Sequence, residues 1–484
     1  MTIIDEAPPA SSLQALRSAA SAKLDAQAMR ARRYQLYYDG ESEIIALLDT
    51  ADRQTFAKFL HEAGADWCEL IVNAVAERLQ IVGFRFADAA ASELAWQVWQ
   101  ASGMDADGEL VQTDALVTGQ SFALVQPDED GDNPTGVEIT AESPFEACVL
   151  YEPGNRRHRI AGYKRFAGID PQDYPWPWGL VAEPAEGVTD VLFTDSTIAI
   201  WQPGSGTPLV QPNPAGVVGL VEIVPQPRTW GPPRSELTPA LPIQDRIHTT
   251  LFNRQVAVDY GANRQVWATG VKMQRQTGTV TGADGVTQEV VSYLPPYNVG
   301  ANRLLVSENP AARFGAIPES ALGGYLAAVD QDVLTMAAIT QTPAWYFQPI
   351  ANLSADAIKA SEAGLVAKIS RRALHIGEGW EEVMRTALAV IGHPAARDRS
   401  AEVLWKDFQT RSVAQLVDAL VKMRTLGVPI EELWRQYGAT PGQVDEWRRM
   451  RVAEESGPQL APQPVPAPAS GKSKAQAPPE PLTP

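Results

Sequence analysis

Metal-binding and disulfide-forming side chains are scarce in this chain of 484 residues, which has two cysteines and five histidines. Cys68 and Cys148 lack the Cys-x-x-Cys or Cys/His spacing of a structural zinc site, and they are too few for a disulfide-stapled secreted scaffold. His61 has no second histidine four residues later, which a zincin helix requires. We therefore expect no metal, no other cofactor, and a protein that is assembled in a reducing compartment.

Positive charge is also in deficit. The chain has 40 Lys and Arg residues against 58 Asp and Glu residues, which gives a formal net charge of −18. Repressors and histone-like proteins hold DNA with surfaces rich in lysine and arginine, so this composition argues against that class. Any contact with DNA is expected to be local or deliberately non-adhesive.

Long uninterrupted apolar runs are missing as well. Two uncharged windows, residues 196–221 and 333–355, contain four and two prolines respectively, so neither can form a continuous membrane helix of about 20 residues. The first thirty residues lack the apolar block of a secretory signal. We expect neither a membrane anchor nor export.

Catalytic motifs are absent too. The triplet Gly471-Lys472-Ser473 resembles the end of a phosphate-binding loop, but the leading glycine is missing and no strand precedes it. Residues 119–123 (GQSFA) narrowly miss a nucleophile elbow, and they join a helix to a strand where the elbow needs the reverse order. We interpret the chain as a non-enzyme; a hydrolase or acyltransferase built on residues 120–230 is the enzymatic alternative.

What the sequence contains is an α+β alternation of helical and strand-like segments. The 354–391 helix has Ser354 as its N-cap and an apolar stripe over roughly ten turns. Thr440 and Gln443 form a capping box for a last helix. Helices are expected at 11–33, 55–80 (two), 94–119, 241–267, 319–340, 354–391 and, as three short ones, 393–451; antiparallel strands at 120–230; and a β-rich insert at 270–317 with Asp284-Gly285 as a hairpin turn.

Six phrases in a fixed order make this arrangement specific. They are DWCELIVNAVAERLQIVGF (66–84), WQVWQASGMDADGELVQTDALVTGQSFALV (96–125), ESPFEACVLYEP (142–153), LPIQDRIHTTLFNRQVAVDYGANRQVWATG (241–270), AAITQTPAWYFQPIANLSADAIKASEAGLVAKISRRALHIGEGWEEVMR (337–385) and VLWKDFQTRSVAQLVDALVKMRTLGVP (403–429). Together they resemble the portal protein, or head-to-tail connector, of tailed double-stranded DNA bacteriophages, in particular of siphophages that infect actinobacteria.

The resemblance implies the phage portal fold, assembled as a ring. After an N-terminal segment (1–30), it assigns the wing to 31–240, two stem helices to 241–267 and 318–340, and the clip to 268–317. It further assigns the tunnel loop to 341–353, a long kinked helix returning to the wing to 354–391, and the crown helices to 392–452. Residues 453–484 are expected to be a disordered tail, because nine of residues 457–484 are proline and none is aromatic.

The resemblance also implies function and partners. The ring, a dodecamer in the family, would sit at one capsid vertex of the virion after assembly in the host cytoplasm, and double-stranded DNA would be packaged and ejected through its lumen. It would dock the terminase large subunit, the major capsid protein, the scaffold and a head–tail connector or adaptor. The alternative is another minor capsid or head-assembly structural protein.

Two sets of residues are candidate functional sites. The stem residues Ile243, Ile247 and Leu251 are expected to pack against neighbouring subunits, so that an isolated subunit would expose them. The tunnel loop is expected to face DNA with an uncharged, partly aromatic surface; the alternative is that its aromatic side chains fill the joint between two helices. Its residues are Gln341, Thr342, Pro343, Trp345, Tyr346, Phe347, Gln348 and Pro349.

Overall fold

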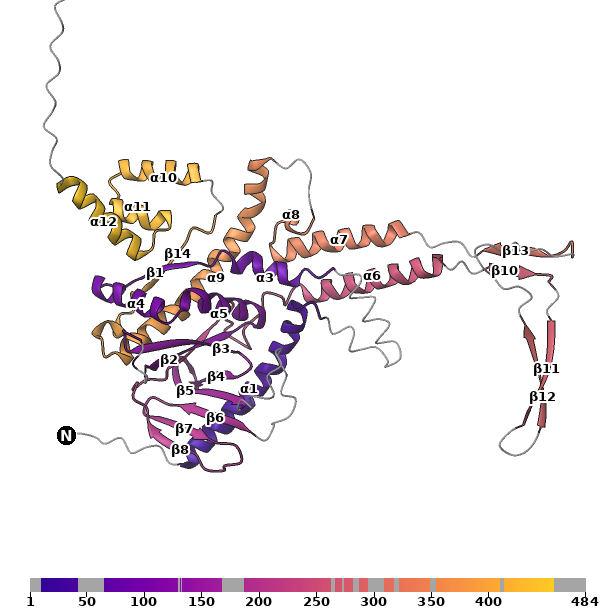
Figure 1. Ribbon diagram of the computed structural model, residues 1–484, viewed down its shortest axis with the longest axis horizontal. Helices are drawn as coiled ribbons and strands as arrows, with labels where there is room; N and C mark the ends of the chain where they lie inside the picture. The colour runs from indigo at the N-terminus through magenta and orange to yellow at the C-terminus, as the bar shows by residue number, and fades with distance from the viewer. Residues whose placement is uncertain are drawn as a thin grey trace, which may run out of the picture. The chain divides into compact units, whose positions relative to one another are not determined.

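The computed structural model describes residues 10–41, 65–128, 131, 133–167, 187–262, 266–271, 274–281, 287–294, 309–316, 322–348, 354–409 and 413–456 (Figure 1). The chain divides into two compact units, residues 1–415 and 416–484. Among the described residues, no helix combines the length and hydropathy needed to span a bilayer. Residues 457–484 of the expected tail and residues 42–64, where one expected helix begins, lie outside the described residues. Residues 453–456, which were also assigned to the disordered tail, are instead the end of a helix.

Helices form the larger part of the secondary structure. Ser354 caps the longest one, because its side chain accepts a hydrogen bond from the Ala357 amide, and Thr440 and Gln443 form the expected capping box. The helices are α1 (Ala10–Tyr38), α3 (Cys68–Ala76), α4 (Ala89–Ala101), α5 (Met104–Thr118), α6 (Leu241–Ala262), α7 (Leu322–Thr340), α8 (Ala344–Phe347), α9 (Ala355–Val390), α10 (Val413–Thr425), α11 (Ile430–Tyr437) and α12 (Pro441–Ser456), with a 3-10 turn at Pro394–Arg397.

The strands pair antiparallel throughout, which confirms the expectation for residues 120–230. One sheet has the order β3-β2-β9 and a second the order β4-β5-β6-β7-β8. The strands are β1 (Ile81–Arg85), β2 (Ser121–Pro127), β3 (Val137–Glu142), β4 (Ala147–Glu152), β5 (Asn155–Ala167), β6 (Val188–Phe193), β7 (Thr197–Trp201), β8 (Leu209–Pro212), β9 (Leu220–Ile223), β10 (Val266–Thr269), β11 (Gln274–Thr281), β12 (Thr287–Leu294), β13 (Arg313–Ala316) and β14 (Glu402–Trp405).

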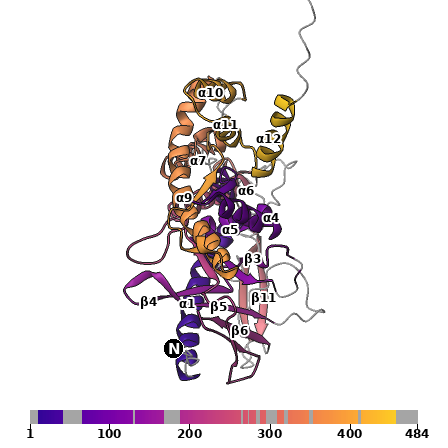
Figure 2. The ribbon, with the colours of Figure 1, turned by 90° about the vertical axis from the view of Figure 1, so that its left-hand side faces the viewer.

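Helix α1 lies along the five-stranded sheet, as both ribbon views show (Figure 2). Its Leu13 and Leu24 are buried among side chains of that sheet. A polar contact fixes the same helix, since the Arg17 Nε donates to the Asp190 carboxylate on β6 at 2.7 Å. The Tyr163 hydroxyl on β5 donates to the other oxygen of Asp190 at 2.7 Å. Helix and sheet are therefore held by packing and by charge together.

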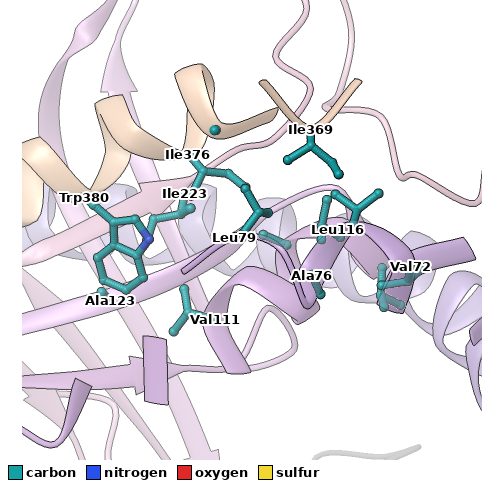
Figure 3. Close-up of a cluster of buried hydrophobic side chains, with 14 of the residues drawn as sticks. Val72, Ala76, Leu79, Val111, Leu116, Ala123, Ile223, Ile369, Ile376 and Trp380 are labelled. Atoms are coloured by element: carbon teal, nitrogen blue, oxygen red, sulfur yellow. The ribbon is translucent and has the colours of Figure 1, made fainter. Parts of the chain in front are cut away.

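The main core of the first unit gathers around α9. The residues of its apolar stripe that face this core, including Ile369, Ile376 and Trp380, are fully buried against α3, α5, β2 and β9 (Figure 3). The Trp380 ring meets the Trp99 ring of α4 edge-on, with centroids 5.0 Å apart. Helix α9 thus lies at the centre of this core, and α3, α4, α5 and the three-stranded sheet pack around it.

A strand pair that the sequence did not predict joins distant parts of the chain. β1 follows α3 directly and pairs antiparallel with β14, so that Phe84 lies opposite Val403. Residues 402–405 fall in the segment expected to be crown helices, and the structure corrects that expectation. Val403 and Trp405 favour an extended backbone, and β1 supplies the strand edge with which they pair.

Helices α6 and α7 lie side by side and run in opposite directions (Figure 1). We expected the first of them to continue to Trp267, but α6 ends at Ala262 and Trp267 belongs to β10, which pairs with β13. Trp267 sits opposite Gly315, where a Cβ atom would lie only 2.5 Å from the indole. β11 and β12 form the expected hairpin, and the Asp284-Gly285 turn between them lies outside the described residues.

Two glycines within helices should respond oppositely to alanine. Gly108→Ala should destabilise the protein by about 1–3 kcal/mol, because the new Cβ would lie 2.7 Å from the buried Trp99 ring. Gly364→Ala in α9 should stabilise it by about 0.5–1 kcal/mol, because nothing lies within 4 Å and alanine is the better helix former. Urea unfolding of both variants checks this; equal shifts would contradict the packing of α5 on Trp99.

Candidate functional site

The junction between α7 and α8 begins with an abrupt helix end. Gln341 has a φ of 55°, and among the described residues it alone combines a side chain beyond hydrogen with positive φ. The Thr342 amide donates to the Ala337 carbonyl at 3.0 Å and the Gln341 amide to the Ala338 carbonyl at 3.4 Å, which is the hydrogen-bond pattern of a Schellman cap. Pro343 then prevents the helix from continuing. The chain turns here at the cost of a strained glutamine.

The three aromatic side chains of the expected tunnel loop pack in the joint between helices. Phe347 is buried with the main core, and the Trp345 and Tyr346 rings lie 4.3 Å apart and are half-buried. The Trp345 Nε1 donates to the Ser361 hydroxyl on α9 at 3.2 Å. These contacts favour the alternative that the aromatic side chains fill a helix joint. Among the same residues, Thr342 and Pro343 are buried and Gln341 is exposed.

An arginine from a distant segment clamps this joint. The Arg78 Nη2 donates to the Tyr346 hydroxyl at 2.7 Å and to the Glu362 carboxylate on α9 at 3.0 Å. Its Nη1 donates to the Phe408 carbonyl at 3.3 Å. One planar guanidinium therefore links the turn after α3, the aromatic loop, α9 and the segment that follows β14. Because the Arg78–Glu362 ion pair is largely buried, salt screens it less than it screens a surface ion pair.

The last described loop residue also has a partner. The Gln348 side-chain amide donates to the Asp330 carboxylate on α7 at 2.9 Å. Asp330 and Gln348 are thus the polar pair that ties the end of α8 back to α7. Pro349, the remaining residue expected to face DNA, lies outside the described residues.

A buried ionic cluster lies behind the same junction. Glu236, in the turn before α6, accepts from Lys368 at 3.0 Å and from Arg372 at 2.9 Å, both on α9. The Gln226 amide donates to the Glu236 carboxylate at 2.8 Å, and the Lys368 ammonium donates to the carbonyl of Thr340, the last residue of α7, at 2.7 Å. The cluster joins the entry to α6, the end of α7 and the middle of α9.

The ionisation of this cluster follows from the balance of burial and charge. Burial alone would raise the pKa of Glu236, but the positive charges of Lys368 and Arg372 outweigh it, and the pKa of this carboxyl lies below its usual value. Burial lowers the pKa of the Lys368 ammonium, and Glu236 only partly opposes that shift. Glu236 therefore stabilises the fold at neutral pH, and its contribution is lost as pH falls through its folded-state pKa.

The structure corrects the expectation for the stem residues. Ile243, Ile247 and Leu251 are 5%, 0% and 4% exposed, and they belong to the main core of their own subunit. An isolated subunit therefore does not expose them. Their helical spacing predicted a buried face correctly, but the side chains that cover it come from the same chain.

A different apolar surface is exposed on the stem pair. Leu322, Leu326 and Leu334 of α7 are exposed. Leu322 and Leu326 lie four residues apart on one face of the helix, and Leu334 lies eight residues further along, turned by about 80° from Leu326. We call these three residues the α7 leucine stripe. It spans about 18 Å along the helix at 1.5 Å per residue.

Sequence reasoning missed the clamp and the ionic cluster. One signal was present, since Lys368 and Arg372 stand four residues apart beside the apolar stripe of α9, where cations need a partner. Nothing in the sequence pointed to Glu236 as the partner of these two cations. Nor did anything point to Arg78 as the residue that contacts Tyr346 and Glu362. In the part of the chain that the structure describes, no group of three or more His, Cys, Asp or Glu residues could hold a metal ion.

Comparisons with known proteins agree over most of the chain. The profile of the family described as "Phage portal protein, SPP1 Gp6-like" matches residues 19–456. The portal protein of Mycobacterium phage L5 is 29% identical over 433 residues (85% of this chain, 83% of the relative), and that of Mycobacterium phage D29 is 28% identical over 433 residues with the same coverage. A chain from the virion of a native gene transfer agent particle has a TM-score of 0.41 at 13% identity, covering 80% of this chain and 94% of that one.

Breaking the ionic cluster should make the fold sensitive to acid. Lys368→Met leaves Glu236 buried with a single cation, and should destabilise the first unit by about 3–5 kcal/mol at pH 7. It should also raise the folded-state pKa of Glu236, so that stability is lost at a higher pH as acid is added. Urea unfolding between pH 7 and pH 4 measures both effects.

The matched control is Arg371→Met, which removes an exposed cation from the same helix. Its stability should stay within about 0.5 kcal/mol of the parent. Equal destabilisation by the two substitutions, or an unchanged acid midpoint in Lys368→Met, would contradict the role of the cluster.

Proposed function

Because this chain belongs to the SPP1 Gp6-like family of phage portal proteins, we propose that its copies form a closed ring through which double-stranded DNA enters and leaves the capsid. Portal proteins are structural components of the virion and not enzymes, which agrees with the missing catalytic motifs. The family match through residue 456 carries this conclusion, and it removes the alternative of a different minor capsid protein.

The domain limits and partners extend this proposal. The wing corresponds to 31–240, the stem to α6 and α7, the clip to the β-rich residues 268–317, the tunnel loop to 341–353, and the crown to 392–452 without β14. A dodecamer, docking of terminase, capsid protein, scaffold and connector, and assembly in the host cytoplasm follow from the family. The net charge of −18 per copy supports a lumen that repels phosphate rather than holding it.

The contact between subunits is the α7 leucine stripe. Leu326 and Leu334 are 50% and 48% exposed, and the buried side chains of this helix, which include Val333, Met336 and Ala337, are confined to its C-terminal half. A neighbouring subunit in the ring would remove this stripe from water, which contributes roughly 25 cal/mol for each Å² of apolar surface covered. The partner surface is the stem of the next copy, because a ring presents the same contact at every interface.

Ring assembly should depend on this stripe. Leu326→Gln/Leu334→Gln should prevent or strongly weaken ring formation, because it places two amides where apolar side chains are expected to meet. Negative-stain images should change from rings to small particles, and sedimentation should report the 52.4 kDa monomer.

The control is Leu209→Gln/Leu374→Gln, in which two equally exposed leucines of the sheet edge and of α9 are changed in the same way. This variant should form rings like the parent. Normal rings from the α7 variant would remove the stripe from the subunit contact while leaving the family assignment intact.

A charge test addresses the tunnel loop. Gln348→Lys alone would place its ammonium beside Asp330, which can neutralise it. Asp330→Asn/Gln348→Lys removes that partner, and should therefore slow DNA packaging at low salt in a way that added salt relieves. In vitro packaging rates at two ionic strengths provide the measurement.

Asp330→Asn serves as the control and should package at the parental rate. If the double variant forms rings and packages at the parental rate at low salt, the end of α8 does not face the DNA. The lumen assignment of 341–353 would then be wrong.

A further inference from the structure

The loop between β9 and α6 exposes an aromatic side chain of unusual size. Trp230 is 84% exposed, the largest exposed fraction among the large hydrophobic residues of the first unit that the structure describes. It lies in the segment Arg228-Thr-Trp-Gly-Pro-Pro-Arg234. Tryptophan buries more apolar surface on binding than most side chains and is enriched at the energetic centres of protein interfaces. An indole this exposed to water is typical of a site that binds another molecule.

Four arginines lie on or beside the loop that carries the indole. Arg228 and Arg234 belong to the same loop, and the Arg156 Nη1 on the β4–β5 hairpin donates to the Arg228 carbonyl at 3.4 Å. Arg30 of α1 lines the same hollow as Pro232 and Pro233. All four arginines are exposed, and no carboxylate of the described residues pairs with any of them. We call these four arginines and Trp230 the Trp230 patch.

The loop that carries the patch is built into the fold. The Arg234 amide donates to the Gln226 carbonyl at 3.2 Å and closes the loop. The Gln226 side chain in turn donates to Glu236 of the buried ionic cluster. On the other side the loop rests on Gly119, where a Cβ atom would lie 3.3 Å from the Pro233 carbonyl oxygen. Trp230 is thus presented by an anchored loop, which lowers the entropy lost when a partner binds.

A small polar hollow opens beside the loop. It has a volume of about 10 Å³ and is lined by Gln27, Gln120, Thr118, Arg30, Ala31, Pro232 and Pro233. Gln27 and Gln120 are only 3% and 5% exposed, yet the Gln27 Oε1 and the Gln120 Nε2 have no hydrogen-bond partner. A buried amide without a partner costs about 1–3 kcal/mol. The hollow admits one small polar atom, such as a hydroxyl oxygen that would accept from the Gln120 Nε2 and donate to the Gln27 Oε1.

We propose that the Trp230 patch is a docking site for an acidic, partly apolar polypeptide segment of another protein. The indole would pack against an apolar side chain, the four arginines would pair with carboxylates, and one side-chain hydroxyl would enter the hollow. Charge complementarity selects this partner, because four unpaired cations gather on a chain with a net charge of −18. None of the residues of the Trp230 patch belongs to the α7 leucine stripe or to residues 341–353.

A protein segment fits the patch better than duplex DNA does. A duplex needs a row of cations along its backbone, whereas these arginines are grouped on and beside one short loop with a protruding indole. The buried amides of the hollow also match a side-chain hydroxyl of a polypeptide, which can accept from the Gln120 Nε2 and donate to the Gln27 Oε1. Duplex binding is therefore the competing outcome that the experiment must separate.

The full-length protein can be tested by fluorescence anisotropy with a labelled peptide of about twelve alternating glutamate and leucine residues. The same peptide with glutamine in place of glutamate, and a short labelled DNA duplex, are the comparison probes. The acidic peptide should bind more tightly than both. Trp230→Ala and Arg156→Gln/Arg228→Gln should each weaken its binding by about tenfold or more.

The control variant is Arg371→Gln/Arg397→Gln, which removes two exposed arginines elsewhere and should change peptide binding by less than about twofold. Equal loss in the control would mean that only net charge matters and would overturn the proposal. So would unchanged binding in Trp230→Ala, or patch-dependent binding of the duplex in preference to the peptide. Ring formation by the same variants, checked by negative-stain images, keeps this result separate from assembly.

Discussion

One buried carboxylate, Glu236, determines how the stem meets the rest of the subunit. Removing it and its two cations from water costs several kcal/mol per ion, and the fold recovers this only because every charge finds a partner at close range. The Lys368 ammonium also donates to the carbonyl of Thr340 at the C-terminus of α7. The negative end of the α7 dipole therefore stabilises the second positive charge of the cluster, which Glu236 alone does not balance. The contacts of Glu236 and Lys368 therefore hold the start of α6, the end of α7 and the middle of α9 together.

Local signals in the sequence predicted the elements of the fold well. Ser354 and the Thr440–Gln443 pair begin helices as expected, and Gly119 ends α5 with a left-handed φ before β2. These features succeed because a cap or a turn depends on residues within one or two helical turns of each other. The order of elements, together with six characteristic phrases, was then enough to suggest the family that the profile match confirms.

The parts of the site that the sequence did not predict all depend on contacts between distant segments. Ile247 has the right spacing for a buried face, but spacing does not reveal whether its own chain or a neighbour covers it. Arg78 reaches Tyr346 and Glu362, and no sequence pattern links these three positions. Trp267 became part of a strand because Gly315 leaves room for its ring. Tertiary packing decided each of these cases.

The pairing of β1 with β14 has a consequence for synthesis. The edge of β1 cannot be covered until a segment roughly 320 residues downstream has left the ribosome, which at about 5–20 residues per second takes tens of seconds. During that interval a growing chain carries an open strand edge and lacks the β14 half of the pair. A polypeptide cut short before residue 402 cannot complete the body against which α9 packs. The first unit can therefore be completed only near the end of translation.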